Sequence, residues 1–475
     1  MESNVPIGLR SSRPAQSPPK PLPPDRRLSS LRPQTQREPT NPIPPQPDLP
    51  TDRRHSYRRP HSHPPSLRHP ERTNQKNSSN LKNPYPNQQH ACPPESSLSL
   101  HGYGVSAKKT MRLPLIKPLA LKEGDVVGIF TPSAPANVLF REKYLHGIRE
   151  LERIGLKVVE GPLTSKVIRD GYRSGSPHER ADEFMHLIRD EKVRCLVSAI
   201  GGMNSGSMLP YLNFEEIRSS RKVICGYSDV TALHMAILSV SGLSTFYGPA
   251  VMPSFGEWPH VLEDTMTSFW RAVASHYEGK RGISPPARFS VQFRDAKTDA
   301  WKVVPREFQA NVGWKVVSPG RASGPMIVAN LNTLLTLAGT KFFPDVEGSI
   351  LVIEDMNAPL SQMERSLRQL DLMGCFSSIN ALVIGKPENY DQQGASFDLE
   401  GLIAEVVGNR SYPILSNFDC GHSVPMLTLA QGCYAWVGAS KDGAIKFEVD
   451  SMVEKRNSEG SAQAAARSRP PVEPA

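Results

Sequence analysis

The stretch VICGYSDVTALHMAI, residues 223–237, contains the end of a strand, a sharp turn and the start of a helix. Its buried-type apolar residues stop at Gly226, and a helical pattern begins directly after Asp229. A strand-to-helix turn of this kind exposes the hydroxyl of Ser228 and directs a helix N-terminus at whatever binds there. Ser and Asp are also ordinary helix N-cap residues. The local pattern therefore leaves two roles open for Ser228, a nucleophile and a cap.

The same order of elements is repeated on the N-terminal side of this stretch. Residues 124–137 predict a buried strand and a polar turn, residues 142–161 an amphipathic helix and a strand, and residues 178–202 a helix, a strand and a Gly-rich loop. Strands that alternate with helices predict a parallel sheet in a layered α/β domain. Ligands of such sheets bind at the carboxyl ends of the strands, where we expect Gly201-Gly202 and Ser228.

Shifts in composition divide the chain into five predicted segments. They are a disordered Pro/Arg-rich tail (1–112), an N-terminal α/β domain that carries Ser228 (113–255), a linker or insertion (256–316), a smaller C-terminal domain of mixed α/β type (317–450) and a disordered C-terminal tail (451–475). The C-terminal domain is predicted from short apolar strands separated by Gly, Asn and Pro, with one clear amphipathic helix.

The N-terminal tail carries the positive charge of the chain. Residues 1–110 hold 22 of the 45 prolines and 17 Lys/Arg against 7 Asp/Glu, whereas the rest of the chain holds 39 basic and 40 acidic residues. This distribution argues against a nucleic-acid-binding role for the folded part. We interpret the tail as a solvated spacer. A polyproline ligand, a polyanion contact and a translation start at Met111 are alternatives.

Other features of the sequence indicate an intracellular enzyme without a metal. We find no secretory h-region and no apolar run of the roughly 18–20 residues that a membrane helix needs. The six cysteines are widely spaced and form no CxxC pair, which argues against a zinc site or a disulfide framework. We therefore predict a cytoplasmic protein with no metal, no cofactor, no membrane contact and no nucleic-acid partner.

Two further residues are candidates for chemistry with Ser228. A serine hydroxyl needs a base to become a nucleophile, and His422 follows a strand in a loop, apart from the helical histidines. Glu354 ends the apolar run SILVIE, where a buried carboxylate needs a partner. It could orient an imidazole. A surface histidine and a strand-end ion pair are the alternative interpretations.

The Gly-rich loop could supply an oxyanion hole. Backbone N–H groups can approach a ligand closely where there is no side chain, so the N–H groups of Gly202 and Asp229 are candidates, with Gly201 and Asn204 beside them. The alternative is a phosphate cradle, but no P-loop or dinucleotide fingerprint is present. Trp314 could stack on a base, or it could belong to the core.

Several separated runs resemble the LD-carboxypeptidase family of serine peptidases. They are AIGGMNSGSMLPYLNFEEIRSSRKVICGYSDVTALHMAI, STFYGPAVMPSFGEWP, ILVIEDMNAPLSQMERSLRQLDLMGCF and PILSNFDCGH. The GG-x-N-S loop, the FGEW run and the segment NLNTLLTLAGT are most similar to the microcin-immunity (MccF-like) subgroup. The resemblance covers about residues 114–448. Two positions depart from the family pattern, Ser207-Met208-Leu209 in place of a basic residue and Asn213 in place of an aspartate.

The resemblance implies a fold, a site and an activity. The fold is a flavodoxin-like N-terminal α/β domain and a C-terminal domain of its own, commonly in a homodimer. The triad is Ser228, Glu354 and His422, at the boundary of the domains. The expected activity is hydrolysis of an amide near a C-terminus through an acyl-enzyme. Its substrate is a murein L,D-peptide or, in the MccF-like subgroup, an acidic amino acid linked to a nucleotide-like group. The alternatives are a non-catalytic binding protein that keeps the cleft and a scaffold that acts through its tail.

Overall fold

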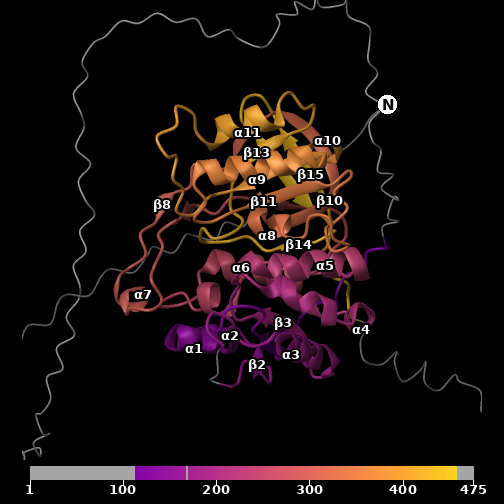
Figure 1. The fold of residues 1–475 in the computed structure, drawn as a ribbon, viewed down its shortest axis with the longest axis vertical. Coiled ribbons are helices and arrows are strands. Elements are labelled where there is room, and N and C mark those ends of the chain that lie inside the picture. The colour runs from indigo at the N-terminus through magenta and orange to yellow at the C-terminus, as the bar shows by residue number, and fades with distance from the viewer. Residues whose placement is uncertain (1–112, 167–169, 457–475) are drawn as a thin grey trace, which may run out of the picture. The chain divides into compact units, whose positions relative to one another are not determined.

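The computed structural model describes residues 113–166 and 170–456 of the chain. The predicted N-terminal tail, and the C-terminal tail from residue 457 on, lie outside the described residues. The described part contains two α/β domains, each built on one large sheet (Figure 1).

The first sheet has six strands in the order β14-β5-β4-β3-β1-β2. Its neighbours pair in parallel, except that β14 runs antiparallel to β5. The carboxyl ends of the parallel strands therefore lie at one edge of the sheet. The strands are β1 (Val126–Phe130), β2 (Lys157–Glu160), β3 (Val193–Ser198), β4 (Val223–Gly226), β5 (Phe246–Tyr247) and β14 (Leu429–Ala430).

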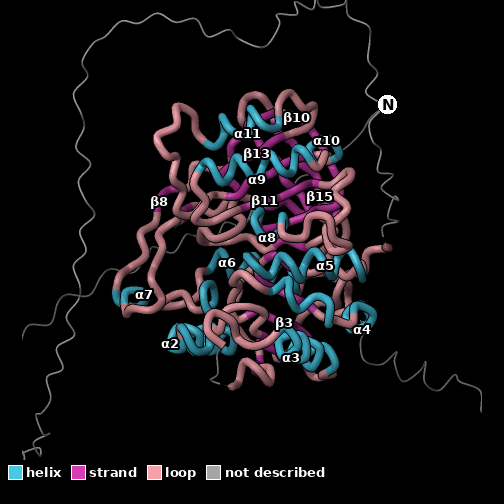
Figure 2. Tube along the Cα trace, viewed as in Figure 1, coloured by secondary structure: helices cyan, strands magenta, loops and turns pink. Residues whose placement is uncertain are grey.

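Helices follow the strands of this sheet, as the alternating pattern predicts. α3 (Pro177–Arg189) begins with a capping box, in which the side chains of Ser176 and Glu179 each accept from the other's backbone N–H. The other α-helices here are α1 (Ala136–Leu139), α2 (Arg141–Arg153), α4 (Phe214–Ser220), α5 (Thr231–Ser241) and α6 (Glu263–Val273). Two short 3₁₀ helices, η1 (Ser205–Tyr211) and η2 (Ser228–Val230), and one π-helix, η3 (Val251–Phe255), complete the set. Figure 2 shows the helices on both sides of the strands.

The second sheet has eight strands in the order β6-β16-β15-β10-β11-β12-β13-β9. The four strands from β10 to β13 pair in parallel and the outer pairs are antiparallel, so the sheet is mixed. Its strands are β6 (Arg281–Ile283), β9 (Lys315–Ser318), β10 (Gly320–Asn330), β11 (Ile350–Glu354), β12 (Ala381–Gly385), β13 (Ile414–Phe418), β15 (Tyr434–Ala439) and β16 (Ile445–Val449). Its helices are α8 (Leu331–Leu335), α9 (Leu360–Leu372), α10 (Cys375–Ser378) and α11 (Leu399–Val407).

The segment between the two sheets contains little regular structure. It holds α7 (Ala300–Val303) and a small two-stranded pairing of β7 (Arg288–Phe289) with β8 (Gln309–Ala310). In Figure 1, α7 lies at the end of a long excursion of the chain.

The C-terminal part of the chain also contributes to the first domain. β14 adds the last strand to the first sheet. Met452 and Val453 are buried, and Arg456 forms an ion pair with Asp125. Residues 451–456 of the predicted C-terminal tail are thus part of the folded structure.

The predicted fold class is confirmed as two α/β domains with parallel-strand sheets. Both faces of the sheets are covered by buried apolar side chains in two large clusters. Within residues 113–166 and 170–456, no helix is long and apolar enough to cross a membrane. The five cysteines of this part are buried and free.

Candidate active site

Ser228 lies on the sharp turn between β4 and α5. Its φ is 62°, in the left-handed region that residues other than glycine seldom adopt. Gly226 permits the tight turn, because a Cβ at this position would lie 2.5 Å from Oγ of Ser198. The side chain of Ser228 is half-buried. Backbone strain of this type concentrates at functional sites, so the geometry fits a nucleophile better than a helix cap.

The Gly201-Gly202 loop lies directly against this turn. A Cβ on Gly201 would be 3.0 Å from Cβ of Ser228 and 3.1 Å from the backbone nitrogen of Asp229. Gly202 has a φ of 151°. Among the described residues, the backbone N–H groups of Gly202 and Asp229 donate to no other protein group. Both N–H groups are therefore available to an oxygen atom bound beside Ser228.

The side chain of Asp229 fixes the loop to the turn. Its Oδ2 accepts hydrogen bonds from the backbone N–H groups of Asn204 and Ser205, both at 2.9 Å. The hydroxyl of Ser205 donates back to the carbonyl of Asp229 at 2.5 Å. The hydroxyl of Ser133 accepts from the N–H groups of Met203 and Asn204. Asn204 is thus a structural member of the loop.

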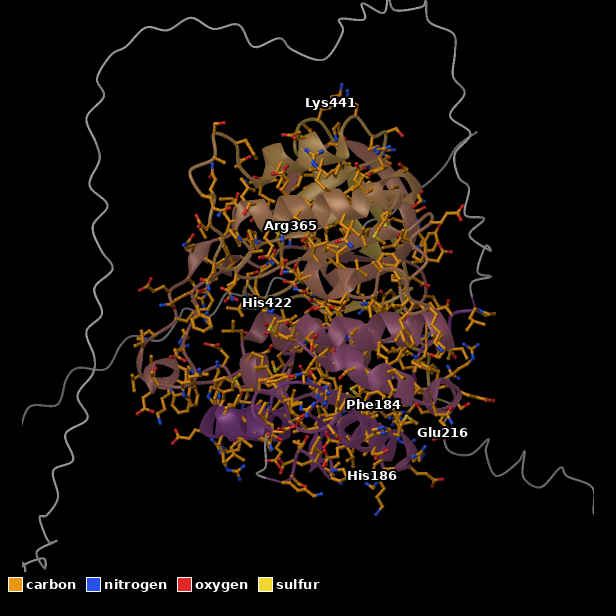
Figure 3. All side chains as sticks on the ribbon, viewed as in Figure 1. Phe184, His186, Glu216, Arg365, His422 and Lys441 are labelled. Atoms are coloured by element: carbon orange, nitrogen blue, oxygen red, sulfur yellow. The ribbon has the colours of Figure 1, made fainter. Side chains whose placement is uncertain are left out.

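Glu354 and His422 form a buried pair at the carboxyl ends of β11 and β13. Nδ1 of His422 lies 2.8 Å from Oε2 of Glu354, and their side chains are 8% and 0% exposed. Gly421 allows this contact, because a Cβ there would lie 2.3 Å from Oε2 of Glu354. Figure 3 labels His422 close to where the C-terminal domain meets the N-terminal domain. A carboxylate in this position fixes the ring so that Nε2 is free to act as a base.

The pair shifts the pKa of both groups. Burial alone lowers the pKa of His422, but the charge and hydrogen bond of Glu354 outweigh burial and hold that pKa above its ordinary value. Burial raises the pKa of Glu354, and His422 together with two further donors reverses that effect, so that the pKa lies below its ordinary value. The structure thus stabilises a histidine cation beside a carboxylate.

Two residues that the sequence analysis missed complete this arrangement. The hydroxyl of Tyr247 accepts the backbone N–H of Ser228 at 3.1 Å and donates to Oε1 of Glu354. Nδ2 of Asn330 also donates to that oxygen, at 3.1 Å. Both residues end a strand, β5 and β10. The strand-end position of Asn330 is the sequence signal that could have found it, whereas β5 has only two residues and gives no such signal.

The turn that carries Ser228 and the side chain of His422 lie beside each other. The ring of Tyr227, the residue before Ser228, is 4.9 Å from the ring of His422 between centroids. Within the described part, the hydroxyl of Ser228 makes no hydrogen bond to His422. Such bonds are often absent without substrate and form in the substrate complex.

Two more carboxylates act on His422. Burial, followed by repulsion from Glu354, raises the pKa of Asp355 to about 6. Burial also raises the pKa of Glu388, which His422 and Arg306 partly offset. The surroundings of the imidazole are thus strongly acidic, which favours its protonated form.

Arg180 holds the far side of the Gly-rich loop. Its guanidinium is 1% exposed and donates to the carbonyls of Pro132 and Asn204, to Oδ1 of Asn204 and to the hydroxyl of Ser207. Ser207 stands in the run where the family pattern has a basic residue. Its hydroxyl helps to close the loop through Asn204. The other departure, Asn213, caps α4 and accepts from two backbone N–H groups, as an aspartate would.

Trp314 lies in an aromatic cluster. It is 9% exposed, packs on Phe418 with a centroid distance of 4.4 Å and donates its Nε1–H to Asp419. These contacts are those of a core residue. The sequence alternative of base stacking has no support from them.

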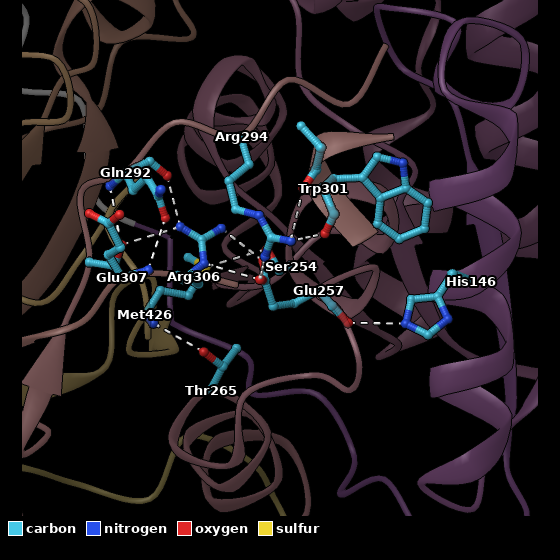
Figure 4. A network of polar contacts seen from close by, with 12 residues as sticks. His146, Ser254, Glu257, Thr265, Gln292, Arg294, Trp301, Arg306, Glu307 and Met426 are labelled. Carbon is cyan, nitrogen blue, oxygen red and sulfur yellow. Dashed lines mark hydrogen bonds and ion pairs between the residues drawn. The ribbon is translucent and has the colours of Figure 1, made fainter. Parts of the chain in front are cut away.

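A buried ionic network joins distant parts of the segment predicted as a linker (256–316). Glu257 forms ion pairs with Arg294 and Arg306 at 2.6 and 2.8 Å, and all three side chains are at most 10% exposed. Figure 4 shows both guanidinium groups converging on the carboxylate, with His146 at the carbonyl of Glu257. In residues 113–166 and 170–456, no group of three or more His, Cys, Asp or Glu side chains is arranged to hold a metal ion.

Both domains match family models of known proteins. Residues 127–248 match the model of the LD-carboxypeptidase N-terminal domain, and residues 323–437 match that of the C-terminal domain. A Vibrio cholerae protein named as a carboxypeptidase is 38% identical over 315 residues, which are 66% of this chain and 92% of that protein. The microcin C7 self-immunity protein MccF of Escherichia coli is 37% identical over 322 residues, 67% of this chain and 91% of MccF.

A more distant relative and a solved structure support the same family. The murein tetrapeptide carboxypeptidase of Pseudomonas aeruginosa is 23% identical over 291 residues, 61% of this chain and 86% of that protein. The structure of MccF in complex with glutamyl sulfamoyl guanosine matches with a TM-score of 0.67 and 34% identity, over 71% of this chain and 99% of MccF. The chain therefore belongs to the LD-carboxypeptidase family of serine-type carboxypeptidases and has the MccF fold.

Proposed function

We propose that the protein hydrolyses an amide bond with Ser228 as nucleophile, His422 as base and Glu354 as the carboxylate that orients His422. The observation that carries this proposal is the buried His422–Glu354 pair beside a strained serine turn. Neither feature has an evident structural purpose, since a buried charge pair and a left-handed serine both cost stability.

The proposed reaction begins with a proton transfer. Nε2 of His422 takes the proton of Ser228, whose oxygen attacks the carbonyl carbon of the substrate. The N–H groups of Gly202 and Asp229 stabilise the oxyanion, because neither has a partner among the described residues and Gly201, the neighbour of Gly202, packs against Ser228 and the nitrogen of Asp229. His422 then gives its proton to the leaving amine. A water molecule, activated by the same histidine, hydrolyses the acyl-enzyme.

Two substrate classes fit a member of this family. One is an L,D-amide of a murein peptide, as the name of the Pseudomonas relative indicates. The other is an aminoacyl group linked to a nucleotide analogue, the class of ligand bound to MccF in its solved structures. We favour the second class, because the identity to MccF is 37% and that to the murein carboxypeptidase is 23%. We further propose that the protein is a cytoplasmic homodimer, by analogy with the family.

The full-length protein tests this function directly. We expect it to release free aspartate from aspartyl sulfamoyl adenosine, or D-alanine from a murein L,D-tetrapeptide, as measured by mass spectrometry. Ser228→Ala should lower kcat roughly 10⁴-fold or more. The matched control is Ser239→Ala, which removes a half-buried hydroxyl of α5 that bonds only weakly to Phe342 and should leave kcat unchanged.

The outcome separates the alternatives. Activity that survives in Ser228→Ala would disprove the mechanism. Binding of these compounds without hydrolysis by the wild type would favour the non-catalytic binding protein. Cleavage of only one of the two compounds would identify the substrate class.

A further inference from the structure

Tyr247 is a buried tyrosine with both hydrogen-bonding functions of its hydroxyl in use. It ends β5 and is fully buried. Its oxygen accepts the N–H of Ser228, and its O–H donates to Oε1 of Glu354. A phenol has one proton to donate, so the donor is committed to the carboxylate. Burial and the nearby Glu354 keep the pKa of Tyr247 well above its ordinary value, and the hydroxyl therefore stays protonated.

The hydrogen bond between Tyr247 and Ser228 supports the strained backbone of the serine. Ser228, which has a positive φ, is the first residue of η2, and the first N–H groups of a helix have no partner within the helix. Tyr247 supplies that partner. A buried N–H without an acceptor would cost free energy, so the phenol helps to maintain the conformation that presents the hydroxyl of Ser228.

The second hydrogen bond of Tyr247 acts on Glu354, a carboxylate of the second domain. Glu354 accepts from His422 at Oε2 and from Tyr247 and Asn330 at Oε1. These donors hold the carboxylate in one orientation, and its orientation sets that of the imidazole. Tyr247 is thus the residue that joins the turn of the first domain to the acid of the second through one oxygen atom.

We propose that Tyr247 is a positioning residue that couples the nucleophile turn to the Glu354–His422 pair across the two domains. This inference rests on the proposed function of Ser228. Among the described residues, Tyr247 makes no hydrogen bond to the hydroxyl of Ser228 or to the imidazole of His422 but bonds to the groups that hold them, so we expect its loss to affect the chemical step and not substrate binding.

The test is Tyr247→Phe in the full-length protein, which removes one oxygen atom and keeps the ring. We expect kcat to fall roughly 10- to 100-fold, the effect of one lost hydrogen bond to a charged group, with KM unchanged. The control is Tyr144→Phe. Tyr144 is equally buried in the same domain and also donates to a carboxylate, Glu160, at 2.7 Å, but among the described residues neither of them bonds to Ser228, Glu354 or His422. We expect kcat of this variant to stay within about twofold of wild type.

The pH profile gives a second measurement that a purely structural role would not move. The charged groups that act on His422 are Glu354, Glu388 and Asp355. A donor withdraws charge from Glu354, so losing the phenol should strengthen the pull of Glu354 on the imidazole proton. The acid limb of kcat/KM should then move to higher pH in Tyr247→Phe and stay in place in Tyr144→Phe.

Two results would overturn the inference. One is a kcat within about twofold of wild type together with an unmoved acid limb, and the other is a rise in KM at constant kcat. Reaction with a fluorophosphonate, which labels an activated serine whatever the natural substrate is, provides the same pH profile. Labelling that survives in Ser228→Ala would instead contradict the proposed function, so the two failures can be told apart.

Discussion

At the scale of single residues, Gly201 allows the proposed nucleophile Ser228 to lie next to the backbone N–H of Asp229, a proposed oxyanion donor. Gly201 packs on Ser228 so closely that a methyl group would contact both its Cβ and the N–H of Asp229. Contacts of 3.0–3.1 Å force a neighbour to move by a few tenths of an ångström. Here the neighbours are backbone atoms and the proposed nucleophile, so the movement would disturb the site.

We therefore expect Gly201→Ala to lower kcat roughly tenfold or more, because misplacing one oxyanion donor is costly. The melting temperature should change little. Gly206→Ala is the matched control, since a Cβ there meets only Cβ of Ala232 at 3.9 Å. Steady-state kinetics and thermal unfolding of both variants check this. Equal kcat values for the two variants would show that the close packing at Gly201 does not matter for the reaction.

The sequence could predict the three candidate catalytic residues, but not the residues that hold them. Ser228, Glu354 and His422 each lie at or soon after the end of a strand-like apolar run, the place where parallel sheets bind their ligands. Tyr247 belongs to a strand of only two residues, which is too short for a periodic signal. Arg180 lies within a helix of amphipathic pattern, where an arginine reads as a solvated residue.

At the scale of elements, α3 supports the Gly-rich loop, which carries the proposed oxyanion donor Gly202, through Arg180. The guanidinium is buried without an ion pair among the described residues and is satisfied by carbonyl and hydroxyl oxygens of the loops at 132 and 204–207. Burial lowers the pKa of Arg180. A buried cation of this kind is costly, so its several hydrogen bonds must fix these loops in place.

Arg180→Met should lower the free energy of unfolding by about 2–4 kcal/mol, because it leaves buried oxygens without donors. It should also lower kcat, since the loop loses its support. Lys222→Met serves for comparison. Lys222 is another buried cation that donates to carbonyls, those of Leu187 and Asp190 at the other end of α3. Chemical denaturation and kinetics should show that both variants are less stable and that only Arg180→Met loses kcat. Loss of kcat in both would make the effect one of stability alone.

At the scale of the whole molecule, segments far apart in sequence build the site. The first sheet supplies Ser228 and Tyr247, and the second supplies Glu354 and His422. β14, which follows His422 in sequence, returns to the first sheet beside β5. The histidine loop is thus held between the two sheets. The mixed second sheet and its parallel centre follow from strand patterns, whereas this return of β14 depends on a two-residue strand that no pattern reveals.

Glu257 holds distant parts of the linker together through its two ion pairs and contacts His146 of the first domain through its carbonyl, and this role can be tested. Glu257→Gln would leave Arg294 and Arg306 as buried cations without a carboxylate. Removing one partner of a buried pair typically costs about 3–5 kcal/mol, so we expect a loss of this size in the free energy of unfolding. Hydrogen exchange should become faster in residues 288–310, which carry both arginines. The control is Glu216→Gln, which breaks an exposed ion pair with Arg189 and should leave the melting temperature unchanged. Unaltered exchange in 288–310 would mean that packing of Trp301 against His146, and not the ionic network, holds the linker in place.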